Sequence, residues 1–436
     1  MELTEQIQVE GSAYAIVVLK PTKKRRISSG RYALDVAGTV DAQEAAAEKV
    51  VSLLEKVSDP RAQAIKQDAL YQSQRGKSVS TLSKPRAGGK PLYLRNLGVV
   101  LGAVDRQTFS QLMKLRGTEV KEVVAAAEMS LIRPEVELDI ASAEPVSWGL
   151  QMLEVEKLWG LNHTGQGVLV GHLDTGVDQS HPMLTGAIDT FAEFDLLGEL
   201  KTNSLGLDSG SHGTHTASII AGREHNGRRF GVAPGAKLAV AQVIEGGNVT
   251  ARVLAGIDWA MEQGAKVVNM SLGLRGYRPL LEEIVLAMRA RNVLPVVAIG
   301  NEGAGTSRTP GNAVGALSVG AVDGDRTVWT GSSSQQFWVK GVARYTPDVL
   351  APGVSVPCAA PNQGIATATG TSLAAPHIAG LAALLWHAYP AARVEQIEIA
   401  IFDSCTRPSH ISQLRGNRGI PNAPIALDNL ARLMTS

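Results

Sequence analysis

The sequence predicts an α/β protein with a doubly wound, mostly parallel sheet flanked by helices, preceded by a small α+β domain. From about residue 145 onward, short continuous apolar runs alternate with helical patterns, as in parallel sheets covered by helices on both faces. Before that point, strands and helices are expected in mixed order and do not alternate regularly. The 436 residues also exceed one average domain, so we expect two units, 1–140 and 141–436.

The first unit is expected to contain strands and helices in mixed order. Residues 14–20 and 97–104 are apolar runs typical of strands, whereas 42–57 and 106–116 repeat apolar residues at helical spacing. Residues 122–134 form a strand-rich segment. This order predicts a small α+β sandwich.

Two basic, polar stretches interrupt the first unit, at 20–31 and 58–92. Segments that bind single-stranded nucleic acid interleave basic residues with aromatic ones on which bases stack. The first stretch has no aromatic residue and the second has only Tyr71. We therefore expect solvated, flexible loops and no nucleic-acid partner, with a nucleic-acid patch as the alternative interpretation.

The second unit is expected to supply the sheet. Its buried strands are predicted at 167–173, 237–243, 265–271, 293–299 and 315–322. A helix over 250–264 begins with Thr250 as its cap and stops at Gly264. Ligands of such a sheet bind beyond the carboxyl ends of the strands, so chemistry is expected there.

Composition excludes several classes of protein. The chain is 44% hydrophobic and 19% charged with a net charge of +1, which gives no electrostatic case for binding nucleic acid or a membrane surface. Its two cysteines cannot form a disulfide framework. The first residues are acidic where a signal peptide needs basic ones, so we expect a cytoplasmic protein, with secretion by another route left open.

Three short glycine-flanked stretches fall at strand ends or helix starts. Asp174 follows the strand at 167–173, His212 opens a helix rich in small residues, and Ser372 lies in "GTSLAAP". A serine hydroxyl is a useful nucleophile at neutral pH only if a base takes its proton, and an imidazole is a good base when a carboxylate orients it. The three stretches therefore predict nucleophilic catalysis. Taken alone, this stretch is better explained as the start of an ordinary helix that uses Thr371 or Ser372 as its cap.

Together these stretches resemble a known family. "DTG" at 174–176, "HGTH" at 212–215 and "GTSLAAP" at 370–376 are similar to the three signature motifs of the subtilase family of serine peptidases, and the similarity extends over 145–436. Their order, Asp then His then Ser, is that of subtilisin. The resemblance implies a subtilisin-like fold, a protein or peptide substrate, and catalysis by Asp174, His212 and Ser372.

The same resemblance implies further site residues. Asn301 matches the asparagine with which subtilases stabilise the oxyanion, although a turn asparagine is the simpler interpretation of this residue alone. Main-chain pairing with an extended substrate is implied for Ser271, Leu272 and Gly273. The wall of the pocket for the residue before the scissile bond is implied to include Ala298, Ile299 and Gly300. Arg308 is expected in or near the base of that pocket, with Glu302 as a neutralising partner.

The element order before residue 135 resembles the subtilase propeptide, a ferredoxin-like domain that inhibits the enzyme and is then removed. The resemblance implies that the first unit acts as an intramolecular inhibitor. The small residues in "ELDIASAEP" indicate self-cleavage within 137–145. The alternative is a domain that stays attached as a regulatory module.

The sequence predicts no metal site and no cofactor. His212 and His215 lie three residues apart with Asp208 nearby, but no further ligand motif for zinc appears. The loop at 223–234 carries basic residues where subtilases bind calcium, which leaves any calcium dependence open.

Two other functions stay open as alternatives. One is a catalytically silent protein that keeps the fold for binding or regulation, against which the retention of all four chemical residues argues. The other is a nucleotide-binding protein, but no glycine-rich phosphate loop follows the strand at 167–173.

Overall fold

The computed structural model describes the protein in the ranges 3–20, 24–29, 32–37, 43–57, 90–126, 129–138, 145–195, 197–201, 204, 206–244, 249–339 and 341–435. For 24–29, 32–37 and Leu138 it describes only the course of the backbone.

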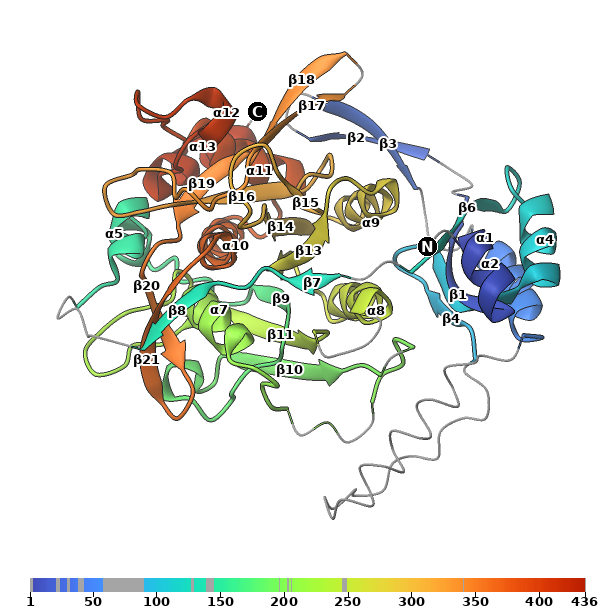
Figure 1. Ribbon diagram of the computed structural model, residues 1–436. Helices are drawn as coiled ribbons and strands as arrows, with labels where there is room; N and C mark the ends of the chain where they lie inside the picture. The colour runs from blue at the N-terminus through green and yellow to red at the C-terminus, as the bar shows by residue number, and fades with distance from the viewer. Residues whose placement is uncertain are drawn as a thin grey trace.

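A seven-stranded parallel sheet forms the centre of the larger unit (Figure 1). Its order is β10 (Ile188–Glu193), β11 (Lys237–Gln242), β9 (Leu169–Asp174), β12 (Val267–Met270), β14 (Leu294–Ala298), β16 (Leu317–Val322) and β19 (Val349–Pro352). Every neighbouring pair is parallel. The predicted doubly wound α/β fold is confirmed.

Helices cover both faces of this sheet because its strands are apolar on both sides. One face packs against α7 (His212–Ala221), α10 (Thr371–Ala388), α11 (Val394–Asp403) and α13 (Ala423–Thr435). The other packs against α8 (Val249–Glu262) and α9 (Pro279–Ala290). Adjacent residues such as Val296 and Val297 therefore belong to opposite cores. Thr250 lies inside α8 rather than capping it, so that detail of the prediction was wrong.

Shorter elements complete the larger unit. They are α5 (Trp148–Leu153), α6 (Glu156–Trp159), a 3-10 turn (Pro182–Leu184), β13 (Leu272–Arg275), β15 (Arg308–Thr309), β17 (Gln335–Val339), β18 (Val342–Thr346), β20 (Val356–Ala360), β21 (Gly364–Thr369) and α12 (Gln413–Gly416). Among the described residues, no helix is both long and apolar enough to cross a membrane.

After a first helix, the N-terminal unit has the β-α-β-β-α-β order of a ferredoxin-like domain, with two further paired strands inserted after its first strand. Its elements are α1 (Leu3–Glu10), β1 (Ser12–Leu19), α2 (Glu44–Leu54), β4 (Leu92–Leu94), β5 (Val99–Asp105), α4 (Arg106–Lys114) and β6 (Val120–Ala125). The four strands form an antiparallel sheet in the order β4-β5-β1-β6.

The first basic stretch is not a loop throughout, which corrects the prediction for 20–31. Strand β2 (Lys24–Ser29) pairs antiparallel with β3 (Tyr32–Ala37), and Ser29 lies opposite Tyr32. A two-residue connection that contains glycine is a hairpin signal, but the run of basic residues obscured it. Of the second stretch, 58–89 lies outside the described residues.

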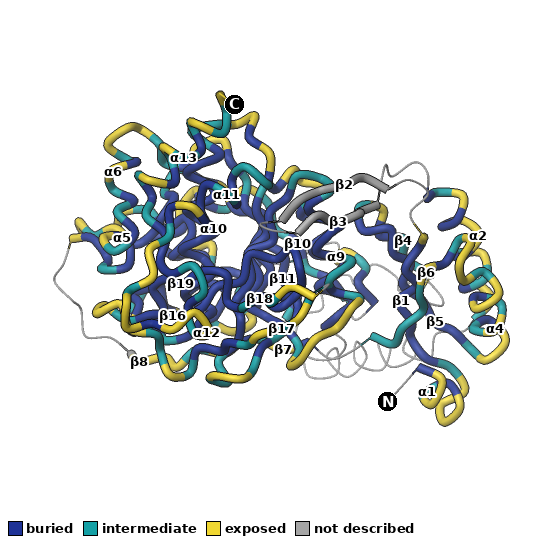
Figure 2. Tube along the Cα trace, turned by 90° about the horizontal axis from the view of Figure 1, so that it is seen from above, coloured by how far each residue is buried: buried dark blue, intermediate teal, exposed yellow. Residues whose placement is uncertain are grey.

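Both faces of the N-terminal sheet are buried, and strand β1 shows why (Figure 2). Its odd-numbered residues, such as Ala15 and Val17, pack with α2 and α4. Its even-numbered residues Tyr14 and Ile16 share a core with α8 and α9 of the larger unit. The phenolic O–H of Tyr14 also donates to the carbonyl oxygen of Leu197 at 2.7 Å. The N-terminal unit therefore docks through its sheet.

The segment that follows this unit crosses the larger unit as an extended chain (Figure 1). Strand β7 (Ser130–Leu131) pairs antiparallel with β13, and β8 (Glu135–Leu138) pairs antiparallel with β21. The crossing places residues 129–138 beside the residues that the sequence singles out.

Candidate active site

Asp174 and His212 lie side by side because a strand of the sheet ends where helix α7 begins. Asp174 is the last residue of β9 and His212 the first residue of α7, and both are buried. The Nδ1 atom of His212 lies 2.7 Å from Oδ1 and 2.9 Å from Oδ2 of Asp174. The Thr175 amide also donates to Asp174 Oδ1 at 2.7 Å. The carboxylate therefore fixes the orientation of the imidazole ring.

The charge state of Asp174 follows from these contacts. Burial alone raises the pKa of the carboxyl group, but the charge and the hydrogen bond of His212 outweigh it, so the pKa lies below its ordinary value. Asp174 is thus an anion near neutral pH, available to accept the Nδ1–H of His212.

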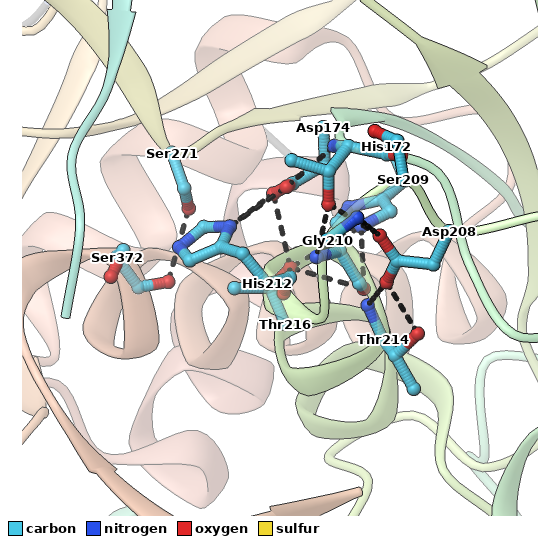
Figure 3. A network of polar contacts seen from close by, with 12 residues as sticks. His172, Asp174, Asp208, Ser209, Gly210, His212, Thr214, Thr216, Ser271 and Ser372 are labelled. Carbon is cyan, nitrogen blue, oxygen red and sulfur yellow. Dashed lines mark hydrogen bonds and ion pairs between the residues drawn. The ribbon is translucent and has the colours of Figure 1, made fainter. Parts of the chain in front are cut away.

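Ser372 lies on the other side of the His212 ring (Figure 3). It is the second residue of α10, and its carbonyl oxygen accepts a hydrogen bond from Ser271 Oγ at 3.0 Å. Among the described residues, neither Ser372 Oγ nor His212 Nε2 has a hydrogen-bond partner, although both atoms are buried. The hydroxyl group and the free nitrogen of the ring are therefore both uncommitted.

Asn301 holds its amide group beside Ser372. Its side-chain oxygen accepts from the amide and the hydroxyl group of Thr371, at 2.9 and 2.8 Å. The Nδ2 atom of Asn301 therefore points away from Thr371, and it donates to the carbonyl oxygen of Arg133 at 2.9 Å. A main-chain carbonyl of the crossing segment thus already contacts the donor that the sequence assigned to the oxyanion.

Gly370 keeps this region open. A Cβ atom at that residue would lie 2.9 Å from Asn301 Nδ2, 3.2 Å from Ser372 Oγ and 3.3 Å from the Cα of Pro134. The three atoms therefore surround one small space next to the hydroxyl group, and a side chain would fill it.

The predicted substrate-pairing residues are occupied by the protein's own chain. Leu272 pairs with Leu131 and Gly273 with Ser130, and the Ile132 amide donates to the carbonyl oxygen of Ser271 at 3.0 Å. The side chains of Met129 and Ile132 are 4% and 1% exposed. The segment thus lies as an added strand with two buried anchors.

The predicted pocket wall lies under this strand. Ala298 and Ile299 are fully buried, and Ile132 belongs to the same apolar core as Ala298. Gly300 has a φ of +123°, and a Cβ atom there would lie 2.7 Å from a carboxylate oxygen of Glu302.

Arg308 and Glu302 form the expected ion pair beside the strand. Arg308 Nε donates to Glu302 Oε1 at 2.8 Å. One Arg308 Nη atom also donates to Ser130 Oγ at 2.9 Å and to the Gly273 carbonyl oxygen at 3.2 Å. Burial would raise the pKa of Glu302, but the hydrogen bond and charge of Arg308 lower it on balance.

Asp208 is a residue that the sequence suggested only as a neighbour of histidines. Its Oδ1 accepts from Thr175 Oγ1 at 2.6 Å and the Gly210 amide at 3.0 Å, and its Oδ2 accepts from the amide and hydroxyl of Thr214 at 2.9 and 2.6 Å (Figure 3). The carboxylate joins the turn after Asp174 to the first turn of α7. No local pattern signals this role, because the partners come from two separate segments.

Metal-binding geometry is absent from the part of the chain that the structure describes: no three His, Cys, Asp or Glu side chains there lie together as ligands. Burial, together with the charge of His212, lowers the pKa of His215 to about 4, so this ring is neutral near pH 7.

Comparison of the sequence with known proteins finds one matching family and several similar proteins. A family model described as the subtilase family matches residues 165–419. Subtilisin Savinase of Lederbergia lenta is 36% identical over 245 residues, which cover 56% of this chain and 85% of that protein. M-protease of Shouchella clausii is 36% identical over 245 residues, covering 56% of this chain and 60% of that protein.

A third relative is the major intracellular serine protease of Bacillus subtilis. It is 32% identical over 266 residues, which cover 59% of this chain and 80% of that protein. The chain thus spans less than two thirds of M-protease but most of the other two relatives. All three matches leave a large part of the present chain uncovered.

Proposed function

Because the chain belongs to the subtilase family, we propose that it is a serine endopeptidase that hydrolyses peptide bonds through Asp174, His212 and Ser372. The observation that carries the proposal is the pairing of His212 Nδ1 with Asp174 at 2.7 Å, which leaves Nε2 free beside a serine at a helix start. The named relatives are proteases, which supports the same reaction.

The chemistry is acyl transfer in two steps. Ser372 Oγ attacks the substrate carbonyl carbon while His212 Nε2 takes its proton, and that proton then passes to the leaving amine as the C–N bond breaks. Water next attacks the ester, again with His212 as base, and releases the acid and the free serine. Asp174 keeps the ring in the correct tautomer and stabilises its charged form.

Asn301 is proposed to stabilise the charge on the carbonyl oxygen during both steps. Its Nδ2 is held by two hydrogen bonds on the opposite oxygen and already donates to a main-chain carbonyl next to Ser372. Loss of one such donor in subtilisin raises the barrier by about 2.7–4 kcal/mol.

We further propose that the intact chain inhibits itself. Residues 129–133 occupy the strand position that a substrate would need on β13, and the N-terminal unit anchors them through the core that it shares with α8 and α9. The carbonyl group that contacts Asn301 belongs to Arg133, and the next residue is Pro134. The peptide bond between Arg133 and Pro134 is therefore a tertiary amide. Self-cleavage within 137–145 would then separate the units; of that region, 139–144 lies outside the described residues.

Two forms of the full chain test both proposals. Wild type and Ser372→Ala are purified, their intact masses are followed over time, and both are exposed to a fluorophosphonate probe that labels activated serines. We expect only wild type to be labelled and only wild type to shorten, with the new end within 137–145. An Asp189→Asn variant, changed at an exposed carboxylate on β10, serves as the matched control.

Each outcome separates the proposals. If the purified Ser372→Ala chain still becomes shorter, self-cleavage is contradicted. If the wild type is labelled but keeps its full length, the N-terminal unit is a permanent regulator. A wild type that is neither labelled nor active on any peptide, even after limited proteolysis, would instead favour a catalytically silent binding protein.

A further inference from the structure

We infer that His172 and Thr216 are positioning residues, which hold the carboxylate of Asp174 through a buried chain of hydrogen bonds (Figure 3). The inference rests on the proposed peptidase function and adds two residues to it, both just outside the motifs at 174–176 and 212–215. Both side chains are wholly buried, so neither can touch a substrate. Their effect on catalysis must therefore pass through Asp174 and His212.

His172 is a polar side chain on a strand that is otherwise apolar up to the catalytic carboxylate. It lies on β9 two residues before Asp174, and it is 0% exposed. Because alternate residues of a strand share a face, the two side chains point to the same side of the sheet. Burying an imidazole costs free energy unless its polar atoms are bonded, so the partners of this ring indicate what it does there.

The ring of His172 is a fixed hydrogen-bond donor. Its Nε2 lies 3.0 Å from the carbonyl oxygen of Gly213, which can only accept, so Nε2 carries the hydrogen. Burial lowers the pKa of His172, and the charge of Asp174 and the Gly213 carbonyl oppose this only in part. The ring is therefore neutral near pH 7, and its Nδ1, which has no partner among the described residues, is an acceptor.

The bond to Gly213 joins the two elements that carry the carboxylate and the base. Gly213 follows His212 in the first turn of α7. A Cβ atom on Gly213 would collide with the carbonyl oxygen of Gly176 and would lie 3.2 Å from the Cβ of Asp174. The main chain of α7 thus touches the turn after β9 here, and the His172 donor ties the strand to the helix at this contact.

Thr216 connects the same ring to the carboxylate. It lies four residues after His212, one turn further along α7, and is 0% exposed. Its Oγ lies 3.2 Å from Asp174 Oδ2 and 3.3 Å from His172 Nε2. The carbonyl oxygens of His212 and Gly213 lie 3.0 and 3.3 Å from the same atom. The hydroxyl group has one hydrogen, so three acceptors compete for it.

The carboxylate is the strongest of these acceptors. A hydrogen bond to an ionised group is about twice as strong as one between neutral groups. The two carbonyl oxygens also belong to the hydrogen-bond ladder of α7, so each has a main-chain donor already. Thr216 therefore donates to Asp174 Oδ2, and its oxygen shares the Nε2–H of His172 with Gly213. A hydroxyl group that accepts one bond is a better donor of the next.

The chain completes the set of donors around Asp174. Oδ1 accepts the Thr175 amide at 2.7 Å, and the Thr216 hydroxyl group supplies a corresponding donor on Oδ2. Between these donors, His212 Nδ1 lies 2.7 and 2.9 Å from the two oxygens. With a donor on each oxygen, the plane of the carboxylate is fixed. Catalytic geometry tolerates displacements of only about 0.5 Å, so loss of one donor would reach the imidazole.

Two matched pairs of variants test this chain. Thr216→Val removes the hydroxyl group and keeps nearly the same shape, whereas Thr216→Ser keeps the hydroxyl group. His172→Leu removes the ring donor, whereas His172→Gln keeps an N–H group at the ε position. Each full-length variant is matured with a trace of affinity-tagged wild type, which is then removed, and Ser372→Ala treated in the same way gives the background.

The readouts are kinetic. Active serines are counted from the end point of labelling by a fluorophosphonate probe. The labelling rate and the kcat and KM for fluorescently labelled, denatured casein are then measured. We expect kcat and the labelling rate to fall roughly tenfold, or about 1.4 kcal/mol, in Thr216→Val and His172→Leu, with KM unchanged. Thr216→Ser and His172→Gln should stay within about threefold of wild type, because each restores its donor.

Two controls distinguish positioning from a loss of stability. Val170→Ala changes a wholly buried residue on the same face of β9, so we expect it to lower Tm without lowering kcat. Tm is measured for every variant. Thr216→Val and His172→Leu combined should lose little more kcat than either alone, because both break one chain.

The outcomes separate this inference from the proposed function. Wild-type kcat in Thr216→Val and His172→Leu would overturn the inference while leaving the peptidase intact. So would an equal loss of kcat in Val170→Ala, or a loss in the combined variant that is the product of the two single losses. If wild type hydrolyses no casein and none of its serines is labelled, the proposed function fails instead.

Discussion

At the scale of single residues, Asp208 illustrates how one carboxylate holds two catalytic segments together. It accepts four hydrogen bonds, two from the first turn of α7 and two from Thr175 and Gly210. In Asp208→Asn, the new amide nitrogen cannot accept, so one of these N–H groups loses its partner. We expect kcat to fall roughly tenfold with KM unchanged, and unfolding to become easier by about 1–3 kcal/mol.

Steady-state kinetics and thermal unfolding check this expectation. Asp189→Asn is again the control, since that carboxylate is exposed on β10. A rise in KM without a change in kcat would show that Asp208 does not position His212.

Gly370 makes a second prediction at this scale. Its φ of 163° is extended and carries no strain, so the need for glycine is purely one of space. In Gly370→Ala, the new Cβ atom would push against Asn301 Nδ2 and Ser372 Oγ. We expect the rate of serine labelling and kcat to fall about a hundredfold, as when an oxyanion donor is lost.

Gly324→Ala is the control here because no atom lies within 4 Å of the corresponding Cβ position. Equal activity of the two alanine variants would mean that the space beside Ser372 is not needed for catalysis.

At the scale of elements, a buried ion pair connects α9 to α11. Arg289 donates to both carboxylate oxygens of Glu398, at 2.9 and 3.1 Å, and both side chains are almost wholly buried. Glu398→Gln would remove the carboxylate charge that faces this buried guanidinium group. We expect the free energy of unfolding to drop by about 3–5 kcal/mol.

Denaturant unfolding measures this loss, and Glu154→Gln gives the comparison. Glu154 pairs with Lys157 on the surface, where an ion pair contributes about 0–1 kcal/mol. If the two variants lose the same stability, the buried pair is no more important than the exposed one.

Sequence patterns predicted most elements of the sheet because each strand is a local apolar run. The triad candidates were equally visible, since Asp174, His212 and Ser372 each lie in a short motif at an element end. What the sequence could not reveal depends on distant partners: β8 is a polar, exposed segment that becomes a strand only by pairing with β21. The β2–β3 pair was missed because β2 is a run of basic and polar residues that has no apolar alternation.

At the scale of the whole molecule, Asp258 is a buried carboxyl group at the contact between the two units. Its Oδ1 accepts the Asn96 amide of the N-terminal unit at 2.7 Å. Burial, with a smaller effect of Glu262, raises its pKa to about 7, and hydrogen bonds from the amides of Asn96 and Leu97 and the charge of Arg291 only partly oppose this.

The sign of the effect follows from the proton count. Between about pH 4 and pH 7, the folded chain keeps a proton on Asp258 that the unfolded chain has lost, so this residue's contribution to stability falls as the pH rises through that range. In the background of Ser372→Ala, in which we expect the chain to stay intact, we expect the further change Asp258→Asn to lessen the decline in Tm from pH 5 to pH 8. An unchanged decline would contradict the raised pKa.

The strand at 129–138 is continuous in sequence with the docked N-terminal unit on one side and the catalytic unit on the other. Its occupation of β13 and β21 is therefore intramolecular, with an effective concentration on the order of millimolar that dilution of the protein does not change. A competing peptide must match that concentration for as long as the chain is uncut. If the chain were cut beyond residue 138, the same contacts would become bimolecular, so dilution would then favour release of this strand from β13 and β21.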